Sequence, residues 1–230
     1  MLYNSCIDGH FYKCYFFQER LVFMPSLNSL IFFLIAYLIG SFPSGLVIGK
    51  RFYNIDIREH GSGNLGGSNA LRVLGKKGGL IVYILDILKG GIVVLIAMNF
   101  QSEIHPLIIA IFALVGHIYP LFASFKGGKA VATSAGIVLF YAPILFLTLA
   151  IVFFGSLAIW KMISVSSVLS SLVTFVVAWT NPFSSESFEG TVPRVIFTLF
   201  MIVIVMRHIP NFKRIVAGTE AKVGQKKKST

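Results

Sequence analysis

The sequence predicts an all-α integral membrane protein that crosses a bilayer several times. Of its 230 residues, 56% are hydrophobic and only 13% are charged, and the mean hydropathy is +0.81. A soluble domain averages about 45 to 50% apolar and about 25% charged residues, because its surface must be polar. This composition excludes an ordinary soluble domain, and it also excludes a disordered chain, which has low hydrophobicity. Two cysteines are too few for a disulfide scaffold.

Apolar segments long enough to cross a bilayer recur along the chain. A spanning helix needs about 20 mostly apolar residues. Six segments meet this requirement by apolar length alone: residues 29–47, 80–100, 106–122, 144–160, 163–179 and 192–206. A further apolar stretch, residues 131–140, carries Thr133, Ser134 and Gly136 and is too short to cross at full thickness. We expect this stretch to form a short or partial span.

The basic residues predict which side of the membrane each loop occupies. Six Lys and Arg residues lie between the first two spans, whereas the next loop carries Glu103 and no Lys or Arg. Cytoplasmic loops are enriched in Lys and Arg, so the first loop is predicted to be cytoplasmic. Lys129 and Lys161 are also expected on the cytoplasmic side. Both can lie there only if the chain crosses the membrane and returns between them. The prediction is about seven helices, with the N-terminus outside and the C-terminus in the cytoplasm.

The first 23 residues do not fit this topology. Both cysteines, Cys6 and Cys14, lie in residues 1–23 together with basic residues that would be on the outer side. No apolar core of signal-peptide length follows these charges. Met24 stands directly before the first span, and we expect it to be the biological start of a single membrane domain over residues 24–230. The alternative is a genuine but poorly ordered extension.

A glycine-rich segment follows the first span. Gly61, Gly63 and Gly66 match the GxGxxG pattern, but no strand is predicted before them, so a dinucleotide-binding turn is excluded. Glycines let backbone N–H groups converge on an anion, and the segment adds neutral donors and an arginine suited to bidentate phosphate binding. These residues are Ser62, Asn64, Ser68, Asn69 and Arg72. We interpret the segment as an anion site, with a flexible linker as the alternative.

The second polar segment, residues 116–133, carries two lysines around a glycine pair. It departs from GxxxxGK[ST], because Ala123 and Ala130 replace the first glycine and the hydroxyl residue, so it is not a nucleotide-hydrolase loop. A helix start after basic and glycine residues can still bind phosphate. The candidate cradle comprises Lys126, Gly127, Gly128 and Lys129. The alternative is a basic loop with a turn, and His117 is then a structural histidine.

Two further polar segments lie at helix ends. Serines at residues 164–167 begin a span, where they either bond to the helix backbone or donate hydrogen bonds to a phosphate. The segment 207–220 is rich in cations and contains Glu220, which we expect to pair with Arg or Lys and to hold the loop in shape. Residues 226–228 are lysines that we assign to topology and to contact with anionic lipid.

Asp86 and Lys89 lie three residues apart on one face of the second span. Charges inside a span are costly and normally face partners within the bundle. A paired structural role and a role in the site both fit this spacing. No Cys/His cluster has zinc-ligand spacing, so neither a metal ion nor a cofactor is expected.

In this order, the motifs resemble those of the acyl-phosphate:glycerol-3-phosphate acyltransferase family of bacteria, the PlsY type. The resemblance covers nearly the whole chain after Met24. It is carried by residues 40–45, 61–72, 86–90, 116–133 and 207–224. The resemblance implies an enzyme of the bacterial cytoplasmic (inner) membrane whose active site faces the cytoplasm. It would transfer an acyl group from acyl phosphate to the 1-hydroxyl of glycerol-3-phosphate, giving lysophosphatidic acid and phosphate.

The resemblance also implies roles for single residues. Ser62 and Arg72 match the family's essential serine and arginine, and Lys129 with its glycines matches the glycerol-3-phosphate loop. The remaining matches are Ser167 with a phosphate-contacting serine, His208 and Asn211 with substrate-binding positions, and Glu220 with a structural glutamate. The expected partners are acyl phosphate, glycerol-3-phosphate, membrane lipid and an enzyme that supplies acyl phosphate. The formal net charge of +11 therefore reflects topology and phosphate binding, and no nucleic acid is expected.

The chain departs from the commonest family pattern at Ala130, Ser68 and the pair Ile209-Pro210. Proline lacks a backbone donor and restricts its predecessor, so the orientation of His208 relative to Asn211 is the least constrained part of the prediction. Acyl phosphate is already activated, so positioning and charge neutralisation can supply much of the rate without a covalent intermediate. We expect a substrate phosphate oxygen, rather than His208, to accept the hydroxyl proton.

A transporter or exchanger of a phosphorylated metabolite is the main alternative function. Transport predicts ionisable residues near the middle of several spans, often in repeat-related halves. Only Asp86 and Lys89 lie well inside a span, and no internal repeat is evident. A membrane scaffold with lipid-binding loops would leave the Ser, Asn and Gly pattern unexplained.

Overall fold

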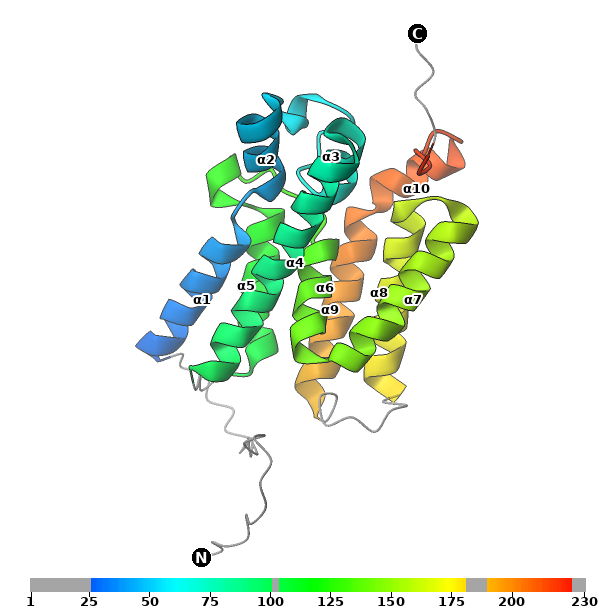
Figure 1. Cartoon of the computed structure of the whole chain (residues 1–230). Coiled ribbons are helices and arrows are strands. Elements are labelled where there is room, and N and C mark those ends of the chain that lie inside the picture. The colour runs from blue at the N-terminus through cyan, green and yellow to red at the C-terminus, as the bar shows by residue number, and fades with distance from the viewer. Residues whose placement is uncertain (1–25, 101–103, 181–189, 225–230) are drawn as a thin grey trace, which may run out of the picture.

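The structure, a computed structural model, describes residues 26–100, 104–180 and 190–224 (Figure 1). All regular elements in these ranges are helical. They are α1 (Leu27–Gly40), α2 (Ser44–Tyr53), η1 (Ile57–Glu59), α3 (Gly67–Val73), α4 (Gly75–Asn99), α5 (Pro106–Ile118), η2 (Leu121–Ala123), α6 (Val131–Tyr141), α7 (Pro143–Trp160), α8 (Ile163–Thr180), α9 (Thr191–Arg207) and α10 (Ile209–Val216). The all-α class predicted from composition is confirmed. The extension at residues 1–23 and the lysines at 226–228 lie outside the described residues.

Most of the long helices are apolar enough to cross a membrane. Within the described ranges five such stretches occur, and a sixth is obtained if α9 and α10, which bend by 46°, form one span. Their outer faces carry exposed large apolar side chains, among them Ile151 at 75% and Phe154 at 66% exposure. Such a surface would be unstable in water and suits contact with lipid chains.

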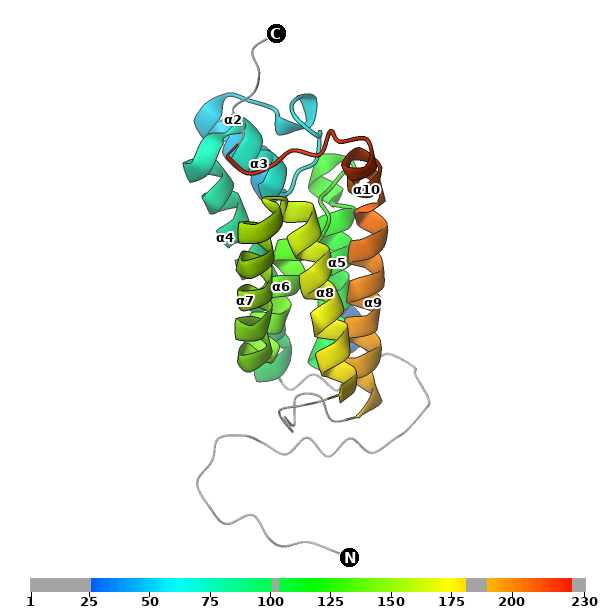
Figure 2. The ribbon, with the colours of Figure 1, turned by 90° about the vertical axis from the view of Figure 1, so that its right-hand side faces the viewer.

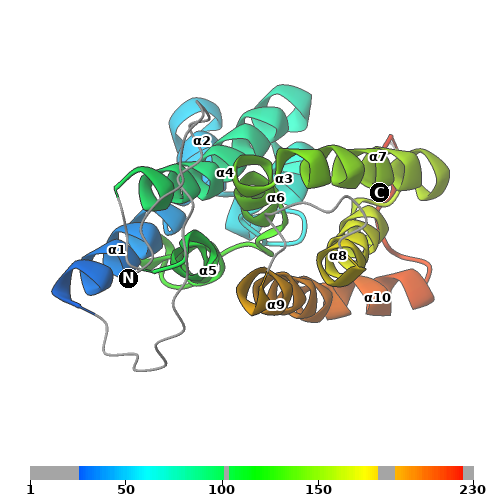
Figure 3. The same ribbon diagram turned by 90° about the horizontal axis from the view of Figure 1, so that it is seen from below.

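The helices form an upright bundle with α6 near its centre. Seen along the bundle, α6 lies among α4, α5 and α7, and it contacts all three (Figure 3). The α4 and α6 helices approach closely at glycines: a Cβ added at Gly136 would overlap the Ile87 carbonyl, and one added at Gly90 would overlap the Thr133 carbonyl. Small residues permit such close helix contacts in membrane proteins.

The predicted first span is interrupted. We expected one helix over residues 29–47, but α1 ends at Gly40 and α2 begins at Ser44. Pro43 lies in the gap, where its missing N–H and its effect on Phe42 favour a break. A second feature is α3, a short helix formed by the second half of the glycine-rich segment, which lies directly before α4.

The predicted short stretch is the 11-residue helix α6. At about 1.5 Å per residue it rises roughly 16 Å, whereas the 18-residue α7 that follows rises roughly 27 Å. Because the two helices meet at Ala142, α6 begins well short of the level at which α7 ends. The loop that contains Lys129 therefore enters the bundle.

Candidate active site

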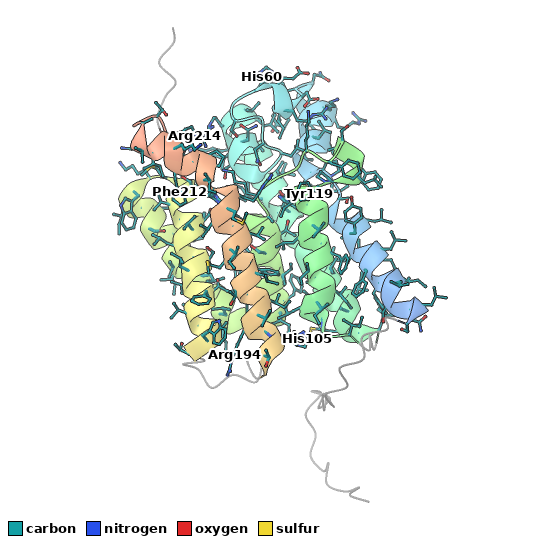
Figure 4. The ribbon with its side chains drawn as sticks, turned by 180° about the vertical axis from the view of Figure 1, so that it is seen from behind. His60, His105, Tyr119, Arg194, Phe212 and Arg214 are labelled. Carbon is teal, nitrogen blue, oxygen red and sulfur yellow. The ribbon has the colours of Figure 1, made fainter. Side chains whose placement is uncertain are left out.

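The predicted polar segments gather at one end of the bundle. The glycine-rich segment before α3, the loop before α6, the α7–α8 turn and α10 all lie at this end (Figures 1 and 2). His60 and Arg214 mark it in Figure 4, whereas His105 and Arg194 lie at the opposite end. Lys129 and Lys161 thus share a side, as predicted, because α6 and α7 carry the chain away and back. We call this end the polar end.

The loop before α6 is held by backbone hydrogen bonds to the end of α5. Gly127 N–H donates to the Ile118 carbonyl at 3.1 Å, and Gly128 N–H donates to the His117 carbonyl at 3.0 Å. A Cβ on Gly127 would overlap the His117 carbonyl, and a Cβ on Gly128 would overlap the His117 ring. The glycine pair is therefore needed for close packing, and its backbone donors are already used within the protein.

Lys129 begins a chain of hydrogen bonds that joins three segments. Its Nζ donates to Asn211 Oδ1, and Asn211 Nδ2 donates to Glu220 Oε1 at 2.7 Å. Ser164 Oγ donates to the same carboxylate oxygen at 2.8 Å. Arg214 Nε pairs with the other oxygen, Oε2, at 2.8 Å. The prediction that Glu220 pairs with a cation is confirmed, and the pair fixes the segment after α10.

Hydrogen bonding outweighs burial at Glu220. Burial would raise the pKa of its carboxyl, but hydrogen bonds from Asn211, Ser164 and Arg214 lower that pKa below its usual value. Glu220 is therefore ionised at neutral pH. Beyond it, Val223 N–H donates to the Lys161 carbonyl at 2.7 Å, so the tail crosses the polar end toward α7 (Figure 2).

Positive charge is concentrated around Lys129. Arg207 donates from its guanidinium to the Gly128 carbonyl at 2.9 Å. Burial lowers the pKa of Lys129 to about 8, and the charges of Arg214, Arg207 and Arg72 act in the same direction, while Glu220 opposes them. The charge of Arg72, in the glycine-rich segment, therefore acts on Lys129 in the loop before α6. A dianionic phosphate placed here would meet several cations at once.

The glycine-rich segment is shaped by Asn69. This buried amide accepts a hydrogen bond from Ser62 N–H at 2.9 Å and donates to the Ile57 and His60 carbonyls at 2.9 and 3.1 Å. Gly61 has φ +66°, a left-handed conformation that L side chains rarely adopt. The buried asparagine fixes this turn and leaves the Ser62 side chain exposed at its surface.

Some side chains that were expected to bind phosphate already make hydrogen bonds within the protein. Asn64 Oδ1 accepts from Gly66 N–H at 2.9 Å, and Ser68 Oγ lies 2.7 Å from Tyr83 Oη. Together with Asn69 they hold the segment rather than offer free donors. Ser62 and Arg72 are exposed, as is Lys126 in the loop before α6, and Arg72 lines a shallow pocket of about 230 Å³ with Ile55, His60, Gly61 and Val73.

Ser167 and Ser164 differ from the expectation. Ser167 is buried and its Oγ donates to the Ile163 carbonyl at 2.8 Å, which is the backbone bond considered as the alternative. Ser164, one turn earlier, makes the contact to Glu220 instead. Serine commonly bonds to the carbonyl four residues earlier in a helix, and sequence alone could not choose between the two serines.

His208 occupies the bend between α9 and α10. Its Nδ1 lies 2.7 Å from the Ile204 carbonyl, and because a carbonyl only accepts, Nδ1 carries the proton and Nε2 is left as the acceptor. Pro210 stands in the first turn of α10, where its missing N–H costs nothing. His208 and Asn211 are both buried at this bend, so the Ile209-Pro210 departure is accommodated.

Ala130 is another of the three departures from the family pattern. It precedes α6 with φ +61° and ψ 8°, the left-handed region, and it is fully buried. Glycine reaches this conformation without a steric cost, whereas an L residue pays about 1 kcal/mol. Its methyl group belongs to the buried core cluster that also contains Leu114 and Ile118, and this burial offsets part of the cost.

Sequence reasoning missed the roles of Arg207 and Arg214. The segment was interpreted only as rich in cations, and the bend between α9 and α10, which separates Arg207 from Asn211 and Arg214, is not evident from the sequence. Asp86 and Lys89 form the predicted pair, with Lys89 Nζ 2.8 Å from Asp86 Oδ1. Among the described residues, no group of three or more His, Cys, Asp or Glu side chains could hold a metal ion.

The chain is similar to known proteins along most of its length. A family model described as glycerol-3-phosphate acyltransferase matches residues 30–218. The glycerol-3-phosphate acyltransferase of Bacillus subtilis (strain 168) is 48% identical over 190 residues, which are 83% of this chain and 95% of the relative. The glycerol-3-phosphate acyltransferase of Macrococcus caseolyticus (strain JCSC5402) is 44% identical over 194 residues, covering 84% of this chain and 96% of the relative.

A solved structure shares the fold. It is a crystal structure of PlsY, an integral membrane glycerol 3-phosphate acyltransferase, in its glycerol 3-phosphate form. The match has a TM-score of 0.77 and 32% sequence identity, and it covers 86% of this chain and 96% of the crystallised chain. The multi-pass helical architecture and these sequence matches show that the chain is an integral membrane protein that belongs to the glycerol-3-phosphate acyltransferase family.

Proposed function

We propose that this protein transfers an acyl group from acyl phosphate to the 1-hydroxyl of glycerol-3-phosphate. The products are lysophosphatidic acid and inorganic phosphate. The relatives' names support glycerol-3-phosphate as the acceptor. The observation that carries the proposal is the cluster of cations at the polar end, where Lys129 is placed by Asn211 among Arg72, Arg207 and Arg214.

Two phosphorylated reactants require this concentration of charge. Each phosphate is an anion, and bringing two of them together in a partly desolvated site costs energy unless cations neutralise them. Lys129, Arg207 and the loop before α6 would hold the glycerol-3-phosphate phosphate. Arg72, with its planar guanidinium and exposed position beside Ser62, would bind the acyl phosphate through two parallel hydrogen bonds.

The reaction needs no covalent enzyme intermediate. The 1-hydroxyl oxygen of glycerol-3-phosphate attacks the acyl carbonyl carbon, and the bond from that carbon to the phosphate oxygen breaks. A phosphate oxygen of the substrate accepts the hydroxyl proton, so atoms and charges balance without a protein base. The protein positions the two substrates and stabilises the developing charge, which are effects large enough to carry much of the rate.

The site is proposed to face the cytoplasm of the bacterial inner membrane. Counting α6 as a short span and α9 with α10 as one gives about seven spans, with the N-terminus outside and the C-terminus inside. The polar end carries most of the described Lys and Arg residues, whereas Arg194 lies at the other end (Figure 4), and basic residues favour the cytoplasmic side. The exposed apolar faces of α1, α4, α7, α8 and α9 would contact lipid, and a separate enzyme would supply acyl phosphate.

Transport is the alternative that the assay must exclude. Asp86 and Lys89 are the charges well inside a described span, and they neutralise one another at 2.8 Å instead of lining a pathway. The purified protein should therefore release phosphate and form lysophosphatidic acid when given acyl phosphate and labelled glycerol-3-phosphate. Acyl-CoA serves as the control donor.

The same preparation tests the absence of a covalent intermediate. Acyl phosphate alone should give no burst of phosphate, and initial rates with both substrates should give intersecting rather than parallel double-reciprocal lines. A burst with parallel lines would establish an acyl-enzyme. No phosphate release and no lysophosphatidic acid under any condition would defeat the enzyme proposal.

A further inference from the structure

A buried polar network lies directly beneath the loop that carries Lys129. It joins α2, α4, α5 and α6, and each member is at most 6% exposed: Ser44, Asp86, Lys89, His117 and Thr133. None of these side chains belongs to the proposed reaction. Buried polar groups in a membrane protein are costly and are kept where they have partners and a role.

Asp86 is the centre of this network. Its carboxylate accepts from Ser44 Oγ at the start of α2 and pairs with Lys89. Lys89 Nζ also donates at 3.0 Å to the Phe42 carbonyl, which lies in the break between α1 and α2 and also accepts from Ser44 N–H at 3.1 Å. His117 Nδ1 lies 3.6 Å from Asp86 Oδ1. The network thus ties the start of α2 to the end of α5.

The His117 ring contacts the chain on both sides of Lys129. Its Nδ1 lies 3.0 Å from Thr133 Oγ1, one turn into α6 after Lys129. Its Nε2 edge packs against Gly128, where any Cβ would overlap it. The His117 carbonyl also accepts the Gly128 N–H at 3.0 Å. One residue therefore contacts both the loop before Lys129 and the helix after it.

We propose that His117 is a positioning residue that sets the location of Lys129 in the phosphate site, and that Asp86 and Thr133 hold its ring in place. This inference rests on the proposed function, in which Lys129 binds the phosphate of glycerol-3-phosphate. A long flexible lysine side chain gains in binding when its backbone is fixed, because less freedom is lost on contact with phosphate. His117 would therefore affect one substrate and not the other.

The test measures steady-state kinetics for both substrates in purified variants. His117→Ala should raise the KM for glycerol-3-phosphate about tenfold and leave the KM for acyl phosphate unchanged. Thr133→Val, which removes only the hydrogen bond, should raise the same KM about threefold. His105→Ala is the matched control, because His105 lies at the other end of α5 (Figure 4). It should leave both KM values unchanged.

A double-mutant comparison at His117 and Gly128 gives an independent readout. Gly128 does not have positive φ, so alanine is allowed there apart from its overlap with the His117 ring. Gly128→Ala should therefore raise the KM for glycerol-3-phosphate strongly. Adding His117→Ala should bring that KM back to the level of His117→Ala alone, because the ring that causes the overlap is gone. If the effects of the two substitutions on this KM are instead additive, contact with the His117 ring does not set the position of the loop, and the proposal is wrong.

The outcomes separate this inference from the proposed function. Lys129→Ala, measured in parallel, should raise the KM for glycerol-3-phosphate; if it does not, the phosphate role of Lys129 fails. If Lys129→Ala behaves as expected but the His117 variants change both KM values equally, or only lower the melting temperature and kcat, His117 is structural and the positioning proposal is wrong. Melting temperatures in detergent identify variants that fail to fold, and Thr133→Val keeps the test valid in that case.

Discussion

Lys129 donates a hydrogen bond to the Asn211 amide oxygen, although the two residues are 82 positions apart in the sequence. The same amide donates through its nitrogen to Glu220, so Asn211 is placed with its oxygen toward a cation and its nitrogen toward a carboxylate. An amide has one donor and one acceptor end, whereas a carboxylate only accepts. The pairing explains why an asparagine suits this position better than an acid of the same shape.

Replacing Asn211 with Asp should disrupt the site. The new carboxylate could still accept from Lys129, but it could not donate to Glu220 and would repel it. We expect Asn211→Asp to lower the melting temperature in detergent and to reduce kcat/KM for glycerol-3-phosphate at least tenfold. Asn99→Asp is the control, since Asn99 is exposed at the end of α4 and donates to the Leu95 carbonyl one turn earlier in the same helix. Equal behaviour of the two variants would contradict the assigned orientation.

Glu220 should contribute to stability through its three partners. Glu220→Gln keeps an acceptor for Ser164 and Asn211 but removes the negative charge that pairs with Arg214. Because Arg214 is 38% exposed, solvent weakens this pair, and we expect a loss of about 1 kcal/mol. Thermal unfolding in detergent measures this loss of stability. Glu59 is an exposed glutamate on η1, and the control substitution Glu59→Gln should show no change.

The same pair predicts a pH dependence of stability. The pKa of Glu220 is lower in the folded protein than in the unfolded chain, where a glutamate titrates near 4.3. Its contribution is therefore complete above that value and is lost as the pH falls through the folded pKa. The difference in melting temperature between the wild type and Glu220→Gln should shrink below about pH 4. A constant difference would mean that the charge is not the cause.

Apolar length and charge predicted the architecture because those properties act on whole helices. The short α6 was foreseen because Lys129 and Lys161 had to share a side over too few residues for two full crossings. The break at Pro43 was missed, since the apolar run continues through it. In the structure the Phe42 carbonyl at this break accepts hydrogen bonds from Lys89 Nζ and from Ser44 N–H, and the contact with Lys89 could not be read from the sequence.

The residue types and segments of the site could be predicted from the sequence, but the hydrogen-bond partners of its side chains could not. The glycine-rich segment and the loop before α6 were recognised as phosphate segments from their composition. Sequence could not reveal that Asn69 and Gly128 use their polar groups within the fold, because the partners of these groups come from other turns and helices. His117 stood alone in the sequence, and its neighbours on α4 and α6 appear only when the helices pack.

Lys129 should control the pH dependence of substrate binding. Its pKa is lowered to about 8 by burial and by neighbouring cations, so the ammonium group loses its charge at moderately alkaline pH. The substrate phosphate is already fully ionised above about pH 7 and does not change in this range. We expect the KM for glycerol-3-phosphate to rise above about pH 8 in the wild type. In Lys129→Arg the rise should disappear, because arginine stays charged.

Arg72 should not be replaceable by lysine. A guanidinium can form two parallel hydrogen bonds to a phosphate, whereas an ammonium is a point charge. We expect Arg72→Lys to lower kcat/KM for acyl phosphate by about 10- to 100-fold while the melting temperature stays unchanged, since Arg72 is exposed. Arg51→Lys, an exposed arginine on α2, is the control. Full activity in Arg72→Lys would refute the bidentate role.

The identity of the proton acceptor is tested at His208. Its Nδ1 is bonded to the Ile204 carbonyl, so only Nε2 could act as a base. Removing a general base typically costs 10²- to 10⁴-fold in rate. Because we assign the proton to a substrate phosphate oxygen, His208→Ala should raise the KM for glycerol-3-phosphate while kcat falls by less than about tenfold. Rapid-quench measurement of a single turnover separates the chemical step from binding. A collapse of that step with unchanged affinity would instead identify His208 as the base.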